Sequence, residues 1–243
     1  MSWFLYGHET WLVAVIKGIP LFLFVYFVLF YLSNYLFYAV TVQLPFLRLS
    51  DEVGFLIANG FGMTNFVLLA VLGYAIGQGV ADGRATAPAV FHPCYLVLAA
   101  GIAMAFLTGD LFNLFVAFEV MLVASYVLIT LDGGKEQVRA GMTYVVVSLL
   151  ASVLFVTVVG LVYAATGTVN MADAAVKLQD VPEGVRLALG LTMLVVFGVK
   201  AAIFPLFSWL PDSYPTAPSP VTAVFAGLLT KVGVYAILRT QTL

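Results

Sequence analysis

The chain has 243 residues, of which 63% are apolar and only 9% are charged, whereas about a quarter of the residues in a soluble domain are charged. With a mean hydropathy of +1.09, this composition excludes a water-soluble globular protein and predicts a surface that faces lipid. The net charge is -2 and the sequence has no basic run, which excludes a nucleic acid as partner. Cys94 is the one cysteine, and no His or Cys residues are clustered, so we predict no disulfide, metal site or cofactor.

Charged residues and prolines divide the sequence into apolar stretches that can be compared with the ~20 residues of a membrane-spanning helix. Lipid offers no partner to unpaired backbone groups, and no stretch alternates like a barrel strand, so we predict an all-α membrane protein. Seven stretches are of roughly spanning length, at residues 19–42, 54–78, 92–109, 112–131, 140–166, 186–207 and 221–239. The short loops between them carry most of the charge.

The first apolar stretch extends over residues 11–42, which is too long for one upright span and too short for two. Lys17, Gly18 and Pro20 interrupt it, so we predict one span preceded by a segment at the membrane interface. No basic residue precedes the apolar run and no small-residue cleavage site ends a short one, so we expect no cleaved signal peptide. Basic loop residues number three on one side of the predicted spans and four on the other, which leaves the orientation open.

Three ionisable residues, Glu119, Lys200 and Lys231, each fall well inside a predicted span. A charge near the bilayer centre costs at least ~2.5–3.5 kcal/mol, so such groups usually face the bundle interior and mark an ion or proton path. Pairing Glu119 with Lys200 leaves Lys231 without an acidic partner inside any span, and a group without a fixed partner can change its protonation state as a relay requires. We therefore predict a proton relay through these three residues; a structural salt bridge is the alternative.

Pro205 lies between apolar residues, five positions after Lys200. It has no amide hydrogen and its ring crowds the carbonyl group of Ala201, which predicts a broken or kinked helix at this point. Broken membrane helices are tolerated where the freed backbone lines a cavity, and transporters place their sites at such breaks. Four further prolines follow closely and predict either the same feature or only the end of the span, at Pro211, Pro215, Pro218 and Pro220.

Four polar residues are candidates for supporting roles around the relay. Asp110 precedes the predicted span 112–131 and is placed to cap that helix. Asp212 follows the helix break, where we expect it to face water or a neighbouring subunit. Ser148 and Ser152 are four residues apart and so share one face of a helix, where they either hold a file of water or bond to the preceding turn.

Three sequence motifs surround the ionisable residues: TGDLFNLFVAFEV at 108–120, GVKAAIFPLFSWLPDSYP at 198–215 and AGLLTKVGVY at 226–235. In this order they resemble the proton-translocating antiporter-like subunits shared by Mrp-type sodium/proton antiporters and respiratory complex I. Phe207, where the complex I relatives commonly have His, and the Asp-Ser-Tyr-Pro that follows are similar to the D-type subunits of Mrp antiporters. The resemblance covers about residues 94 to 239.

The resemblance implies roles for the ionisable residues and a division of the chain. It implies an ion pair between Glu119 and Lys200, with Lys231 as the central relay group. It also implies that residues 92–243 form the first five-helix repeat, with its helix broken near Pro205, and that a second, inverted repeat is absent. Residues 1–50 are then a divergent membrane segment, and residues 51–91 an additional transmembrane helix and loop. Since full-length members are considerably longer, we expect a fragment, a wrongly ended reading frame, or a half-subunit completed by another polypeptide.

The predicted function is that of a proton-translocating subunit of a multisubunit cation/proton antiporter in the cell membrane. The expected partners are the lipid bilayer, other membrane subunits, protons and sodium, although no cluster of carboxylates and carbonyls can be assigned to sodium. We do not expect the isolated chain to be an enzyme. Two alternatives stay open: a proton-pumping subunit of a complex I-like or hydrogenase-linked complex, and a structural membrane subunit in which Glu119 and Lys200 form a locking salt bridge.

Overall fold

The computed structural model describes residues 64, 67–77 and 90–242. The chain divides into two units, Met1–Phe66 and Val67–Leu243, and the helices presented below belong to the second. The predicted span 19–42, most of 54–78 and the predicted boundary after residue 50 lie outside the described residues. The described end of span 54–78 forms the apolar helix Val67–Gly77.

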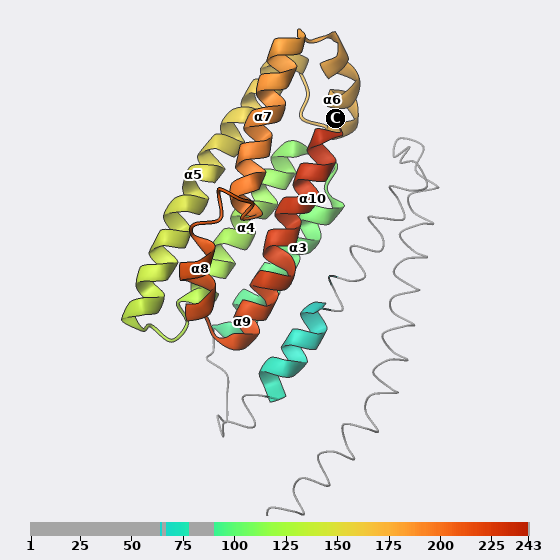
Figure 1. The fold of residues 1–243 in the computed structure, drawn as a ribbon. Coiled ribbons are helices and arrows are strands. Elements are labelled where there is room, and N and C mark those ends of the chain that lie inside the picture. The colour runs from blue at the N-terminus through green and yellow to red at the C-terminus, as the bar shows by residue number, and fades with distance from the viewer. Residues whose placement is uncertain (1–63, 65–66, 78–89, 243) are drawn as a thin grey trace, which may run out of the picture. The chain divides into compact units, whose positions relative to one another are not determined.

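The core of the second unit is a bundle of helices, and the described residues contain no strand. Its members are α3 (Phe91–Leu107), α4 (Leu111–Ile129), α5 (Lys135–Thr166), α7 (Glu183–Lys200) and a continuous helix of α9 (Ser219–Val224), η3 (Phe225–Leu229) and α10 (Thr230–Gln241). Each overlaps one of the predicted spans from 92–109 onward, which confirms the all-α prediction for this part of the chain. Contacts run from α3 to α4, α5, α7, α10 and back to α3, so the bundle forms a closed ring (Figure 1).

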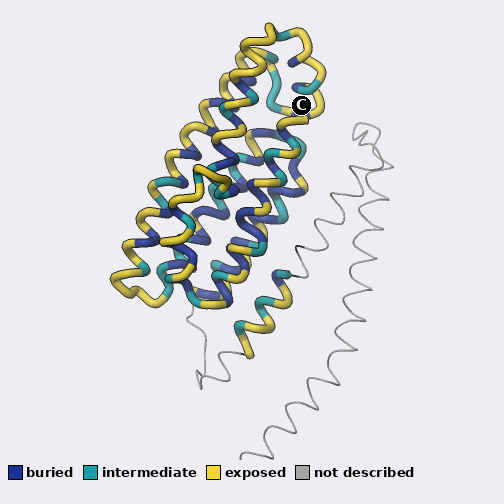
Figure 2. The backbone as a smooth tube through the Cα atoms, in the orientation of Figure 1, coloured by how far each residue is buried: buried dark blue, intermediate teal, exposed yellow. Residues whose placement is uncertain are grey.

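The outward face of the bundle is apolar, as expected of a protein that lies in lipid. Three described helices are long and apolar enough to cross a membrane: α4, α5 and the continuous helix Ser219–Gln241. The helices bury one face against their neighbours and expose the other (Figure 2). On α5 the exposed face includes Val146, Leu150 and Val153, and so much exposed apolar surface on one helix is typical of a lipid-facing side.

Hydrogen bonds join the capped N-terminal ends of α4 and α6 (Met171–Lys177). Asp110 Oδ1 accepts the backbone N–H of Asn113 at 2.9 Å and so caps α4, as predicted. Asn170 caps α6 in the same way, and the two capped ends are joined by a hydrogen bond from the backbone N–H of Met171 to the carbonyl of Gly109 at 2.9 Å. The sequence predicted only a charged loop in the region of α6, so this short helix was not foreseen.

The helix is broken near Pro205, as the sequence predicted, although the regular helix is shorter than the predicted span. We predicted a span over 186–207, but α7 ends at Lys200, and no regular helix follows before α8 (Leu210–Ser213), which continues into η2 (Tyr214–Thr216). The backbone N–H of Ile203 bonds to the carbonyl of Gly198 at 3.0 Å, and Ala202 adopts a left-handed φ of 53°. A left-handed residue cannot continue a right-handed helix, so the helix ends beside Ala201, the residue whose carbonyl group the ring of Pro205 would crowd in a continued helix.

Gly233 lets α10 lie against the backbone of this break. A Cβ atom at this position would lie 2.6 Å from the backbone nitrogen of Ala201, closer than two such atoms can approach. The glycine therefore permits a contact that any side chain would prevent. The end of α7, including Lys200, is in this way fixed by a helix that lies more than thirty residues later in the sequence.

Candidate functional site

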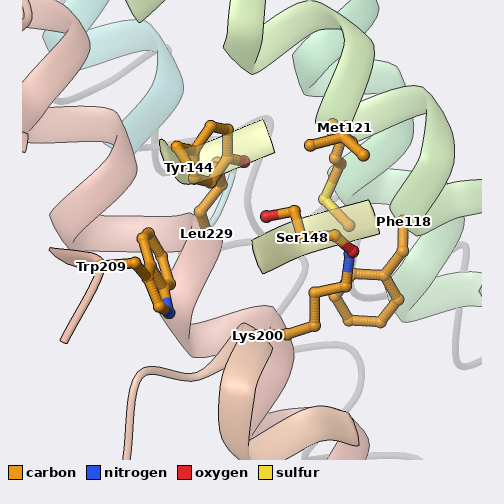
Figure 3. A pocket seen from close by; sticks show the side chains of 8 residues that line it. Phe118, Met121, Tyr144, Ser148, Lys200, Trp209 and Leu229 are labelled. Atoms are coloured by element: carbon orange, nitrogen blue, oxygen red, sulfur yellow. The ribbon is translucent and has the colours of Figure 1, made fainter. Parts of the chain in front are cut away.

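Lys200 lies beside a small cavity inside the bundle, at the point where α7 ends (Figure 3). The cavity has a volume of about 30 Å³, which is enough for water, since one molecule needs about 10–15 Å³. Helices α4, α5 and α7, the segment after the break and η3 all contribute to its wall. The lining residues are Phe118, Met121, Leu122, Tyr144, Ser148, Lys200, Trp209 and Leu229.

The Lys200 ammonium group is held by neutral oxygen atoms and an aromatic ring. Its Nζ donates to the carbonyl oxygen of Ser148 at 3.2 Å and to Oγ of Ser152 at 3.0 Å. It also lies 5.7 Å from the centre of the Phe118 ring, within the range of a cation–π contact. The sequence had placed Ser148 and Ser152 on one face of a helix, and the structure brings that face to Lys200.

Glu119 is half-buried and does not form the implied ion pair. Among the described residues, the one ion pair within 4.0 Å joins Lys177 to Asp173, at 2.8 Å. The Glu119 Oε1 atom is buried and accepts no hydrogen bond from the described residues. A buried carboxylate oxygen without a partner is unfavourable, so this atom is available to a donor such as water or a moving ammonium group.

Lys231 lies on a different face from Lys200. The sequence predicted three buried relay residues, but the side chain of Lys231 is exposed on α10, together with Val234 and Leu238. Its Nζ donates to the carbonyl oxygen of Ala226 in the π-helical η3 and to Oγ1 of Thr230. Single turns of π-helix are frequent at functional sites. Lys231 is not among the residues that line the Lys200 cavity.

The predicted residues Asp110, Asp212 and Pro205 do not line the cavity. Asp110 serves as the cap of α4, and Asp212 is exposed in α8. Pro205 lies in the turn after α7, and its peptide bond with Phe204 is cis. None of Asp110, Asp212 and Pro205 lines the cavity, so any effect they have on Lys200 acts through the position of the helix ends.

Three further residues at this site, Ser125, Tyr144 and Trp209, were not predicted from the sequence. The hydroxyl groups of Ser125 and Tyr144 are 2.7 Å apart and buried. The Trp209 indole donates to the carbonyl oxygen of Val199 at 3.1 Å and packs on the Tyr144 ring at 5.3 Å between centres. Tyr144 continues the four-residue spacing of the two predicted serines, and this periodicity would have identified it. Nothing in the linear sequence pairs Tyr144 with Ser125 or Trp209.

Comparison with known proteins places this arrangement in a family. Residues 108–243 match the model of the family described as NADH:quinone oxidoreductase/Mrp antiporter, TM. The chain is 54% identical over 154 residues to the D-type subunit of the Na(+)/H(+) antiporter of Alkalihalophilus pseudofirmus, covering 63% of this chain and 31% of that protein. It is 44% identical over 193 residues to the D-type subunit of the Na(+)/H(+) antiporter of Bacillus subtilis, covering 77% of this chain and 39% of that protein.

A solved structure has the same fold. A chain of the Mrp complex from Dietzia sp. DQ12-45-1b matches with a TM-score of 0.65 and 29% sequence identity, over 94% of this chain and 45% of that one. The chain therefore spans less than half the length of these relatives. The match of the family model to more than half of the chain agrees with the resemblance that the three motifs indicated. This chain belongs to the NADH:quinone oxidoreductase/Mrp antiporter family of membrane proteins.

Proposed function

We propose that this chain forms the proton-relaying part of a subunit in a multisubunit cation/proton antiporter of the cell membrane, with sodium as the exchanged cation. The observation that carries the proposal is Lys200 at the end of a broken helix, beside a cavity large enough for water, with neutral oxygens as its hydrogen-bond acceptors. A lysine held by neutral oxygens can lose its proton without breaking an ion pair. The names of the two bacterial antiporter relatives support the choice of sodium.

The relay works through a change in the distance between Lys200 and Glu119. At an effective dielectric constant of about 20, unit charges attract by about 4 kcal/mol at 4 Å, and the attraction falls as they separate. One charge moved across 100 mV gains about 2.3 kcal/mol, so a movement of the lysine side chain between Glu119 and the serines is energetically sufficient to couple proton transfer to the membrane potential. The free Oε1 atom of Glu119 supports this step.

Lys231 is the next group of the proposed relay. It lies in the same continuous helix as Leu229, which lines the Lys200 cavity, and its ammonium group is exposed on an apolar face. A charged group on an apolar membrane surface is unfavourable, so in the complete assembly this face is covered by another protein segment that receives the proton. Transport therefore requires the other membrane subunits of the assembly.

Substitution of Lys200 in the complete antiporter tests the proposal. Lys200→Ala is expected to lower sodium-driven proton movement in everted membrane vesicles at least about a hundredfold, as for loss of a proton-transfer group. The measurement is the fluorescence of a ΔpH-sensitive dye after sodium addition. Lys177→Ala, which removes an exposed lysine from α6, is the matched control and should exchange at the wild-type rate. Wild-type exchange by a fully assembled Lys200→Ala protein would overturn the proposal.

The second candidate is a proton-pumping subunit of a redox-linked complex, which the NADH:quinone oxidoreductase part of the family name favours. The same Lys200 relay would then be driven by electron transfer in a partner protein of the complex. Purification of the intact complex separates the candidates. Sodium-driven proton movement without any reductant supports the antiporter, whereas proton uptake that requires NADH or another reductant supports the redox-linked complex.

A further inference from the structure

Tyr144 lies in the wall of the Lys200 cavity (Figure 3), and its hydroxyl group connects α5 to Ser125 of α4. Its oxygen is 2.7 Å from Oγ of Ser125. Ser125 is 0% exposed and does not line the cavity. The two hydroxyl groups therefore form a buried pair, and its Tyr144 member lines the same cavity as Lys200.

The direction of the hydrogen bond between Tyr144 and Ser125 follows from one further contact. Ser125 donates its hydroxyl hydrogen to the carbonyl oxygen of Leu122 at 2.9 Å. A serine hydroxyl has only one hydrogen, so Ser125 can offer only lone pairs to Tyr144. Tyr144 is therefore the donor to Ser125, and its own oxygen is left as an acceptor on the side of the cavity.

The other groups in contact with the Lys200 ammonium group also present acceptor atoms or electron-rich surface to it. The carbonyl oxygen of Ser148 and Oγ of Ser152 accept from the ammonium group, and the face of the Phe118 ring is electron-rich. A water molecule in this cavity that donates its hydrogens to these acceptors, Tyr144 among them, turns a lone pair toward Lys200. The proton can then move from Nζ to that lone pair: the N–H bond breaks with its electron pair left on nitrogen, and an O–H bond forms on the water, which carries the proton onward.

We propose that Tyr144, anchored by Ser125, is a positioning residue that orients the water accepting the proton of Lys200. The inference rests on the proposed relay at Lys200 and extends it to two residues on α4 and α5. It assigns to Ser125 an effect on proton transfer although its side chain does not reach the cavity. Loss of either hydroxyl group removes the preferred orientation of this water molecule. Without the Ser125 hydroxyl group, the hydroxyl hydrogen of Tyr144 is free to turn toward the cavity.

The test compares single and double variants in the complete, reconstituted antiporter. Tyr144→Phe and Ser125→Ala are each expected to lower the maximal exchange rate about tenfold, as for one hydrogen bond lost from the transition state, with the apparent KM for sodium unchanged. Because both act through one hydrogen bond, the double variant should be no slower than the slower single variant. Tyr126→Phe is the matched control, since this α4 tyrosine contacts Met142 near the surface. Co-purification of the other subunits verifies assembly of each variant.

The outcomes separate this inference from the function on which it rests. Wild-type rates for an assembled Tyr144→Phe protein would overturn the inference, and so would multiplied effects in the double variant, which indicate two independent packing defects. If Lys200→Ala abolishes exchange while Tyr144→Phe does not slow it, only the positioning role fails. If Lys200→Ala exchanges normally, the proposed function itself fails, whatever the Tyr144 variants do.

Discussion

The two lysines Lys177 and Lys200 show how surroundings decide what a charged residue can do. Lys177 bonds to Asp173 on the surface of α6, and this hydrogen bond lowers the pKa of the Asp173 carboxyl below its ordinary value. Such an exposed pair contributes little to stability. Lys200 is inside the bundle and has only neutral oxygens and a ring in hydrogen-bond or cation–π contact among the described residues. These neutral surroundings bind the ammonium group of Lys200 but still allow it to lose its proton.

The hydroxyl group of Ser152 is expected to help hold the Lys200 ammonium group in place. Ser152→Ala removes the acceptor 3.0 Å from Lys200 Nζ, and hydrogen bonds to charged groups contribute about 1.5–3 kcal/mol. The exchange rate of the assembled antiporter should therefore fall about tenfold or more. Thr157→Ala is the control on the same helix, because the Thr157 side chain is exposed and its hydroxyl donates to the carbonyl oxygen of Val153, one turn earlier. An unchanged rate for Ser152→Ala would show that the ammonium group does not depend on this oxygen.

The end of α7 and the start of α10 act together as one structural element. Helix α7 stops at Lys200, the left-handed Ala202 turns the chain away, and Gly233 of α10 lies against the backbone at Ala201. The position of Lys200 is thus determined by a backbone contact between two helices and by the serines of α5. A small displacement of α10 moves the lysine relative to its acceptors.

Gly233→Ala is expected to disturb this contact. The added Cβ would lie 2.6 Å from the nitrogen of Ala201, and overpacking of this kind costs about 1–3 kcal/mol. Thermal unfolding in detergent should begin at lower temperature, and exchange should fall because Lys200 is displaced. The control is Gly160→Ala in α5, where a Cβ meets nothing within 4 Å and where Ala is favoured over Gly by about 1 kcal/mol. Equal stability of the two variants would contradict the close approach of α10 to the break.

For the molecule as a whole, the bundle combines a buried polar site with an apolar outer surface. Helices of the ring line the cavity at Lys200, while the exposed face of α5 includes the large apolar residues Val146, Leu150 and Val153. Lys231 is a charged residue exposed beside the apolar residues Val234 and Leu238. The relatives are more than twice as long as the matched region, which agrees with the proposal that this face is covered in the complete assembly.

A charge placed on the outer face of α5 should prevent membrane insertion. Leu150 is 63% exposed on this face, and Leu150→Arg adds about 2.5–3.5 kcal/mol to the insertion free energy. The amount of protein in the membrane fraction should fall, as measured by immunoblotting. Val176→Arg is the control because Val176 is exposed on the short helix α6, outside the candidate spans. Normal insertion of Leu150→Arg would show that this face does not contact lipid.

The long apolar helices from α3 onward, unlike the short helix α6, were predictable because hydropathy and charge act along the chain: a stretch of about 20 apolar residues forms a helix in lipid whatever lies beside it. The same reasoning selected Glu119, Lys200 and Lys231, since a charge inside an apolar stretch is visible without coordinates. The packing of the helices decided the features of the site that the sequence did not predict. The outward direction of Lys231 and the contact between Tyr144 and Ser125 depend on side chains that are distant in sequence. Such contacts form only when whole helices pack, because close packing couples each side chain to neighbours that no local pattern specifies.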